Sequence, residues 1–141
     1  MDLVDLDPGD PRLAADVFPV LHELRPHLTV ESFAAVYAEG HPRGLRFTAL
    51  YDDGRCVAVA GWRVVATTSV LRKLYVDDLV TTSSQRSRGH GRTLLAALTD
   101  RARQAGCRAI DLDSGVRRTD AHRFYEREQM ALTSHHFARR L

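Results

Sequence analysis

The chain has 141 residues, of which 44% are hydrophobic and 27% are charged, so it fits one globular domain over residues 1–141. The formal net charge of +2 and the scattered arginines do not indicate a nucleic-acid-binding face. No apolar run approaches the roughly 18 residues that span a membrane, which excludes a membrane-embedded protein.

The first residues, Met1–Asp5, are acidic and lack the basic-then-apolar layout of a signal peptide, so we expect a cytoplasmic protein. Two cysteines, Cys56 and Cys107, are too few for a disulfide framework and are expected to be free thiols. Neither has a partner at metal-ligand spacing, and His135 and His136 have no suitable third ligand, so no metal site is expected.

The N-terminal third predicts a short strand and two helices. The strand covers Leu3–Leu6. Asp10 and the proline after it are typical of a helix start. Apolar residues then recur at spacings of three and four as far as Pro26, namely Leu13, Val17, Leu21 and Leu24. A second helix is predicted from its cap at Thr29 to Gly40, with Phe33, Val36 and Tyr37 on one face.

The middle of the chain predicts three strands with short turns, over residues 45–51, 56–67 and about 70–82. Asp52-Asp53-Gly54 is typical of a tight hairpin turn. Consecutive strands joined in this way form an antiparallel meander.

The pattern then alternates between helix and strand. A helix is expected over residues 91–105 with Gly106 as its C-cap, and a strand over 109–112. A helix capped by Thr119-Asp120 would run to about Glu128, with Ala121, Phe124 and Tyr125 facing inward, and Leu132–Leu141 would form a last strand. Such crossovers return to one sheet, so the predicted fold is α+β, with a mixed central sheet and helices on both faces.

The most informative segment lies between a predicted strand and a predicted helix and reads Arg-Ser-Arg-Gly-His-Gly-Arg, residues 86–92. Two glycines let the backbone approach a ligand closely, and the N-terminus of a helix attracts anions. The arginines add positive charge, so the segment suits a pyrophosphate. It lacks the lysine of a P-loop and the third glycine of the dinucleotide fingerprint. On these seven residues alone, a helix cap on a solvated turn is an equal alternative.

The wider pattern resembles the GNAT superfamily of N-acyltransferases. Arg86-x-x-Gly89-x-Gly91 is similar to that family's pyrophosphate loop, Leu74–Thr81 to the strand before it, and Ala121–Glu126 to a later helix that carries a tyrosine. The resemblance covers residues 45–141. Two positions depart from the family pattern: Gln129-Met130 replaces a common Gly-Phe, and no asparagine precedes the tyrosine helix.

The resemblance implies an acetyl-CoA-dependent acyltransferase whose sheet splays open beside the cofactor. The backbone of Leu79–Thr81 would pair with the pantetheine arm, and the loop would hold the pyrophosphate. The implied cofactor-binding residues are Leu79, Val80, Thr81, Arg86, Ser87, Arg88, Gly89, His90, Gly91, Arg92 and Thr93.

Three residues are candidates for catalysis. Amine acylation needs a base, because an alkyl amine is mostly protonated at neutral pH. Asp77 aligns with the acidic base of polyamine-acetylating relatives and is the first candidate. Asp78 would contribute only if a bulge turned it inward, since neighbouring strand residues face opposite sides. Tyr125 would act as the general acid near the thioester sulfur. A polar strand end and a core tyrosine are the alternatives.

The sequence thus predicts an N-acetyltransferase that acts on the primary amine of a small molecule by direct transfer in a ternary complex. Asp77 favours a cationic acceptor, whereas Arg117 and Arg118 favour a phosphonate or carboxylate at its far end. The family often dimerises, which leaves a homodimer open. The rival interpretations are a non-catalytic acyl-CoA-binding sensor, which needs neither Asp77 nor Tyr125, and a regulatory module that binds RNA or protein.

Overall fold

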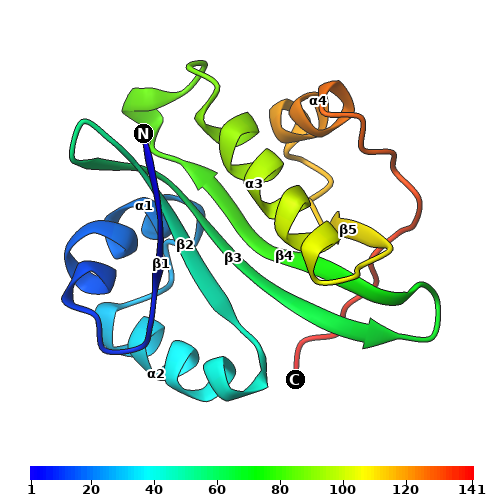
Figure 1. Cartoon of the computed structure of the whole chain (residues 1–141), viewed down its shortest axis with the longest axis horizontal. Helices are drawn as coiled ribbons and strands as arrows, with labels where there is room; N and C mark the ends of the chain where they lie inside the picture. Colours follow the sequence, from blue (N-terminus) through cyan, green and yellow to red (C-terminus); the bar gives the residue numbers. More distant parts are fainter. The chain divides into compact units, whose positions relative to one another are not determined.

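The computed structural model describes residues 1–141 and contains the predicted α+β architecture (Figure 1). Five strands form one mixed sheet in the order β1-β2-β3-β4-β5. The strands are β1 (Asp2–Leu6), β2 (Arg46–Asp52), β3 (Arg55–Thr67), β4 (Leu71–Thr81) and β5 (Ala109–Leu112). The helices are α1 (Phe18–Leu24), α2 (Val30–Gly40), α3 (His90–Gln104) and α4 (Thr119–Arg127). None of them is both long and apolar enough to cross a membrane.

Residues 1–111 form one compact unit and residues 112–141 another, so the two are described separately. In the first unit, α1 and α2 cover one face of the sheet and α3 covers the other (Figure 1). The core under α1 and α2 is built from Leu6, Leu13, Val17, Val20, Leu21, Phe33, Tyr37, Leu45, Phe47, Ala49, Cys56, Val59 and Val80. On the other face, α3 buries Leu94, Leu95, Leu98 and Ala102. The prediction of helices on both faces is therefore confirmed.

The helical N-terminal segment begins where the sequence predicts. The Asp10 carboxylate accepts a hydrogen bond from the backbone N–H of Arg12 at 2.9 Å, as a helix cap does. One wide π turn (η1, Leu13–Val17) follows and leads into α1, which ends before Pro26. Thr29 caps α2 together with Ser32, which confirms the predicted start of that helix.

One residue of α2 differs from the prediction. Phe33 and Tyr37 are buried, but the Val36 side chain is 50% exposed. Val36 lies three residues after Phe33 and one before Tyr37, so it falls at the edge of the helix's apolar stripe, where the sheet no longer reaches it. Of the three apolar residues predicted on one face of this helix, Phe33 and Tyr37 therefore form the buried part and Val36 the exposed margin.

The hairpin between β2 and β3 forms as predicted. Asp53 and Gly54 have positive φ angles of 50° and 73°, which is the backbone form that suits the twist of a two-residue hairpin. Strands β2, β3 and β4 then pair antiparallel, as a meander does. The last residues of β2 and the first of β3 therefore lie at the end of the sheet where β4 also ends.

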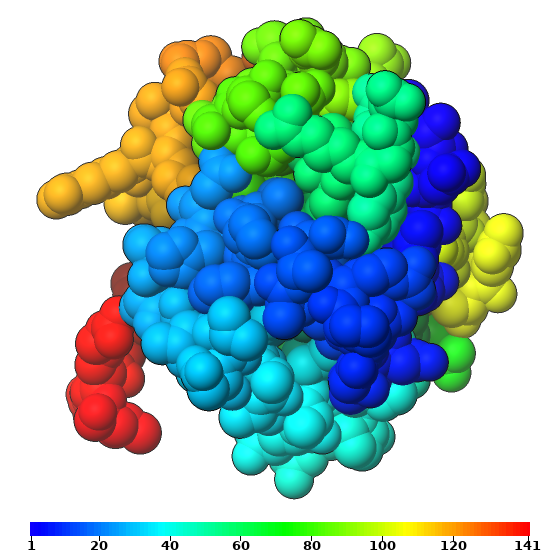
Figure 2. Space-filling view, turned by 90° about the vertical axis from the view of Figure 1, so that its left-hand side faces the viewer, coloured from blue at the N-terminus to red at the C-terminus, as the bar shows by residue number.

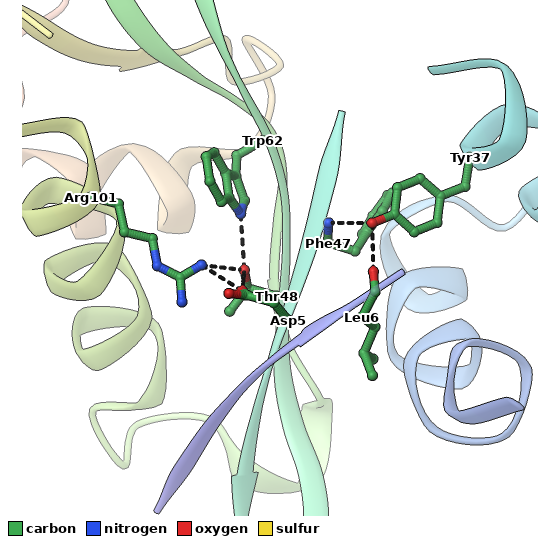
Figure 3. A network of polar contacts seen from close by, with 7 residues as sticks. All are labelled: Asp5, Leu6, Tyr37, Phe47, Thr48, Trp62 and Arg101. Carbon is green, nitrogen blue, oxygen red and sulfur yellow. Dashed lines mark hydrogen bonds and ion pairs between the residues drawn. The ribbon is translucent and has the colours of Figure 1, made fainter. Parts of the chain in front are cut away.

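A hydrogen-bond network fixes α3 to the sheet (Figure 3). The Thr48 hydroxyl donates to the Asp5 carboxylate at 2.7 Å and accepts from the Trp62 indole N–H and from Arg101, both at 2.9 Å. On the opposite face, the Tyr37 hydroxyl donates to the carbonyl of Leu6 at 2.6 Å (Figure 3). These contacts tie β1, β2 and β3 to the last turn of α3, where Arg101 lies.

The second unit contains α4 and the C-terminal segment. Thr119 is the first residue of α4 instead of its cap, and the residue before it, Arg118, makes no side-chain capping bond. Residues 130–141 form no regular structure, so the predicted strand over Leu132–Leu141 was wrong. Its alternating pattern is compatible with a strand, but a strand needs a hydrogen-bonded neighbour, and Phe137 is 92% exposed.

Candidate active site

A β-bulge interrupts β4 at the two aspartates. Gly61 of β3 lies opposite Asp78, whereas the next residue of β3, Trp62, lies opposite Val76. Asp77 is therefore an extra residue in β4, and the alternation of faces changes there. Val76 lies outside the core under α1 and α2, but Val80 belongs to it. The bulge turns Asp78 toward the α1 face, which is the condition under which the sequence allowed it a role.

Asp77 is held by an arginine of the neighbouring strand. The Arg63 guanidinium donates from Nε to Oδ2 at 2.9 Å and from Nη2 to Oδ1 at 2.8 Å. Both carboxylate oxygens of Asp77 thus accept hydrogen bonds from one guanidinium group, and this bidentate arrangement is the strongest geometry for an arginine–carboxylate pair. The resulting hydrogen bonds raise the pKa of Arg63. Both carboxylate oxygens of Asp77 are therefore occupied by donors of Arg63.

Asp78 has a different environment. Its Oδ1 accepts from Nε of Arg25, in the chain directly after α1, at 2.7 Å, and its side chain is only 15% exposed. Its Oδ2 lies over Gly61, 3.1 Å from where a Cβ at that position would stand. Burial raises the pKa of Asp78 above its ordinary value, and Arg25 opposes this shift. Asp78 therefore combines a raised pKa with a second carboxylate oxygen that Arg25 does not occupy.

The end of β4 has one paired edge. Residues 79–81 pair with Ala58–Ala60 of β3. On the other side, β5 has four residues against eleven in β4. The backbone N–H of Arg108, just before β5, donates to the carbonyl of Arg72 near the start of β4 at 2.8 Å. At about 3.3 Å per residue, β5 is too short to reach Leu79–Thr81.

The loop after β4 leads into the N-terminus of α3. A short 3₁₀ turn, Ser83–Gln85, is followed by positive φ angles of 64° at Ser87 and 80° at Gly89, which precedes the helix. A Cβ added at Gly89 would meet no atom within 4 Å, so open space lies beside it. Arg86 and Arg88 are exposed. The first N–H groups of the helix have no acceptor within the helix, so the loop presents donors and positive charge together.

Two of the predicted loop residues contribute in other ways. The Thr93 hydroxyl donates to the carbonyl of Gly89 at 3.0 Å and so stabilises the first turn of α3. The His90 ring is buried, with 4% exposed, and its Nε2 lies 3.9 Å from Oδ2 of Asp52 at the β2–β3 hairpin. Only the backbone of His90 is therefore available to a ligand.

Glu23 of α1 fastens the beginning of the loop, and nothing in the sequence singled it out. Its carboxylate accepts from the Thr82 hydroxyl at 2.7 Å and from the backbone N–H of Ser83 at 2.9 Å. Burial alone would raise the pKa of Glu23, but these hydrogen bonds outweigh it and hold the pKa below its ordinary value. The hairpin supports the same loop, because Arg55 donates to the Ser84 hydroxyl at 3.1 Å. The hairpin and the segment near residue 84 lie side by side in Figure 2.

Tyr125 lies on α4 in the second unit. Its ring packs edge-to-face against Phe124 with 5.3 Å between centroids. Burial raises the pKa of its phenol, and a hydrogen bond and the charge of Arg118 oppose the shift. Tyr125 is therefore protonated at neutral pH, as a general acid must be.

Known proteins resemble this chain in sequence and in fold. The sequence model of the acetyltransferase (GNAT) family matches residues 12–129. An uncharacterised N-acetyltransferase of Bacillus subtilis is 36% identical over 116 residues, which are 79% of each chain. An aminoalkylphosphonate N-acetyltransferase of Salmonella typhimurium is 42% identical over 53 residues, 38% of this chain and 34% of that one. A solved aminoglycoside N-acetyltransferase in complex with CoA has the same fold, with a TM-score of 0.83, 16% identity and coverage of 99% and 93%.

Proposed function

The chain belongs to the GNAT family of acetyltransferases, and on this basis we propose that it transfers an acetyl group from acetyl-CoA directly to the primary amine of a small molecule. Membership makes it an acetyl-CoA-dependent acyltransferase. The observation that supports acetylation of an amine most directly is Asp78, a largely but not fully buried carboxylate with a raised pKa on the strand that leads into the loop.

The residues present fit CoA. The exposed arginines Arg86 and Arg88, the open space beside Gly89 and the first N–H groups of α3 would hold the pyrophosphate. The free edge of Leu79–Thr81 offers backbone donors and acceptors to the amides of the pantetheine arm. The aminoglycoside N-acetyltransferase with the same fold is a complex with CoA, which supports this assignment.

The proposed roles of the two aspartates are the reverse of the order that the resemblance suggested. Asp78 takes the proton of the acceptor's ammonium group, and the neutral amine then attacks the acetyl carbonyl carbon. Asp77 and Arg63 hold the bulge in shape. As the carbon–sulfur bond breaks, Tyr125 donates its proton to the thiolate, and the second proton that the attacking nitrogen loses passes through solvent to the Tyr125 phenolate. Alignment of amine and thioester supplies much of the rate.

A covalent acyl-enzyme is not part of the proposal. Burial raises the pKa of the Cys56 thiol to about 12, so the nucleophilic thiolate is absent at neutral pH. Cys107 lies in the connection between α3 and β5, away from both the loop and the bulge. The amine therefore attacks the thioester itself, in a ternary complex.

The acceptor is proposed to be a small amine that also carries an anionic group. The Salmonella typhimurium relative is an aminoalkylphosphonate N-acetyltransferase, which supports this class over polyamines. The test is a panel of amines with acetyl-CoA. The panel contains polyamines, amines that also carry an anionic group, and amines with no other charged group. Release of the CoA thiol and the mass of the acetylated amine are both measured. Thiol release without an acetylated product, or no release with any amine, would contradict the proposal.

Replacing Tyr125 with phenylalanine is expected to lower kcat by about 10²-fold and to change the KM for acetyl-CoA little, because a proton donor acts only as the thiolate leaves. Phe124→Leu is the matched control, since it alters packing on α4 and keeps the phenol. Single-turnover measurements show whether chemistry limits the rate. If Tyr125→Phe turns over at the wild-type rate when chemistry is limiting, Tyr125 serves packing alone.

A further inference from the structure

Two arginines from distant parts of the sequence meet at the bulge residue Asp77. Arg63 of β3 binds its carboxylate, and Nη2 of Arg25 donates to its backbone carbonyl at 3.1 Å. Arg25 also binds the Asp78 carboxylate. Both guanidinium groups are thus within hydrogen-bond distance of a single residue, and one of them contacts the proposed base.

In this cluster the negative groups are more buried than the positive ones. The carboxylates lie inside, with 22% of Asp77 and 15% of Asp78 exposed, and the guanidinium groups lie outside, with 43% of Arg25 and 35% of Arg63 exposed. Each arginine uses Nε and Nη2 for the contacts with the aspartates. A guanidinium has five N–H donors, so Nη1 of each arginine and one further N–H remain for a ligand.

This outward layer stabilises the fold only weakly. The side chains of Arg25 and Arg63 are 43% and 35% exposed, and ion pairs with a solvent-exposed partner contribute little to stability. Two adjacent guanidinium groups with unused donors are, however, the usual recognition element for phosphonate, phosphate and carboxylate groups. Arg25 contacts the Asp78 carboxylate and is the more exposed of the two, so unused donors lie beside that carboxylate on its solvent side.

We propose that Arg25 and Arg63 bind an oxyanion group of the acceptor and so select amines that carry a phosphonate or carboxylate a few bonds away. The inference rests on the proposed function and names the residues that set its substrate class. Nε of Arg25 lies 2.7 Å from Asp78, so an amine on the other Asp78 oxygen is on the order of 6 Å from the guanidinium. That separation fits a spacer of two or three carbons.

The test compares three acceptors of similar length: 2-aminoethylphosphonate, β-alanine and propylamine. The wild-type protein is expected to show a higher kcat/KM with the two anionic amines than with propylamine. In Arg63→Gln the ratio of kcat/KM between the anionic amines and propylamine is expected to fall about 10- to 100-fold, the value of a charge-assisted contact. Arg63→Lys keeps the charge and should restore part of the ratio.

Arg103→Gln is the control, because Arg103 is an exposed arginine of α3 that pairs with Asp100, three residues earlier on the same helix. The ratio of kcat/KM between the anionic amines and propylamine should be the same in Arg103→Gln as in the wild type. Comparing 2-aminoethylphosphonate with β-alanine shows whether the site prefers a phosphonate or a carboxylate. Thermal melting of each variant shows whether it is folded.

A second readout does not depend on turnover. Calorimetry with CoA-loaded protein should show 2-aminoethylphosphonate binding that is lost in Arg63→Gln and kept in Arg103→Gln. If the protein acetylates amines but propylamine is used as well as the anionic amines, or Arg63→Gln lowers all three equally, the arginines only fasten α1 and β3 to β4 and the inference is wrong. If no amine is acetylated while binding depends on Arg63, the proposed function fails and the oxyanion site stands.

Discussion

Replacing Gly91 with glutamate is expected to reduce the affinity for CoA by more than about 100-fold and to leave the fold intact. Gly91 is the second residue of α3, where backbone N–H groups point out of the helix and the helix dipole is positive. A carboxylate there would occupy the place proposed for the pyrophosphate and repel it. Calorimetric titration with CoA measures the loss, and circular dichroism measures the fold.

Two further variants at this position separate charge from bulk. Gly91→Gln has nearly the size of glutamate without its charge, and Gly91→Ala adds only a methyl group and favours the helix. Affinity should fall in the order alanine, glutamine, glutamate. If Gly91→Glu binds CoA as the wild type does, the loop after β4 is a solvated helix cap and the pyrophosphate lies elsewhere.

Replacing Asp78 with asparagine is expected to lower kcat on the order of 10²- to 10⁴-fold, the usual contribution of a general base. In the wild type, kcat/KM should fall with decreasing pH through a pKa above that of an ordinary aspartate, because burial raises it and only the deprotonated carboxylate accepts a proton. Without the carboxylate, the reaction depends on amine that is already neutral. The pH profile of Asp78→Asn should therefore shift to higher pH.

Stability distinguishes this effect from misfolding. The raised pKa of Asp78 means that its charged form is less favourable in the folded than in the unfolded protein. Its contribution to stability is thus full below the unfolded pKa and is lost as pH rises through the folded pKa. Asp78→Asn should consequently melt no lower than the wild type at pH 7, even though it is nearly inactive.

Asp77→Asn is the matched control. It removes the carboxylate of the residue next to Asp78. Both oxygens of that carboxylate are bound by Arg63. A loss of activity of a few-fold with an unchanged pH profile is expected. If Asp77→Asn shifts the pH profile and Asp78→Asn does not, Asp77 is the base, as the family resemblance suggested, and the pair with Arg63 opens when substrate binds.

The parts of the fold that depend on local chemistry could be predicted from the sequence. The Asp53-Gly54 turn has the residue types that its positive φ angles need. The Thr29 cap and the glycine-arginine loop are likewise specified by neighbouring residues. The prediction of a last strand was wrong because it depended on a contact with a distant segment. The pattern of Leu132–Leu141 satisfies strand propensity, but pairing is a tertiary property that the segment cannot supply alone.

The detailed site was less predictable. The sequence indicated both aspartates and the loop, but a bulge is a mismatch between two strands, and neither strand shows it alone. Arg25 and Glu23 were missed because their partners lie 53 and 59 residues away. A charged residue at the end of a helix is most often solvated, so only the folded structure reveals that these two residues fasten α1 to β4 and to the loop.

The extra residue at Asp77 makes the length of β4 as important as its composition. Before the bulge, even-numbered residues such as Val76 lie on the α3 side; after it, even-numbered residues such as Val80 lie on the α1 side. Deletion of one residue between Val76 and Val80 would restore strict alternation, so the apolar side chains of one half of β4 would then point to the opposite face of the sheet. A substitution here changes one side chain, whereas a one-residue deletion changes the face on which every later residue of the strand lies.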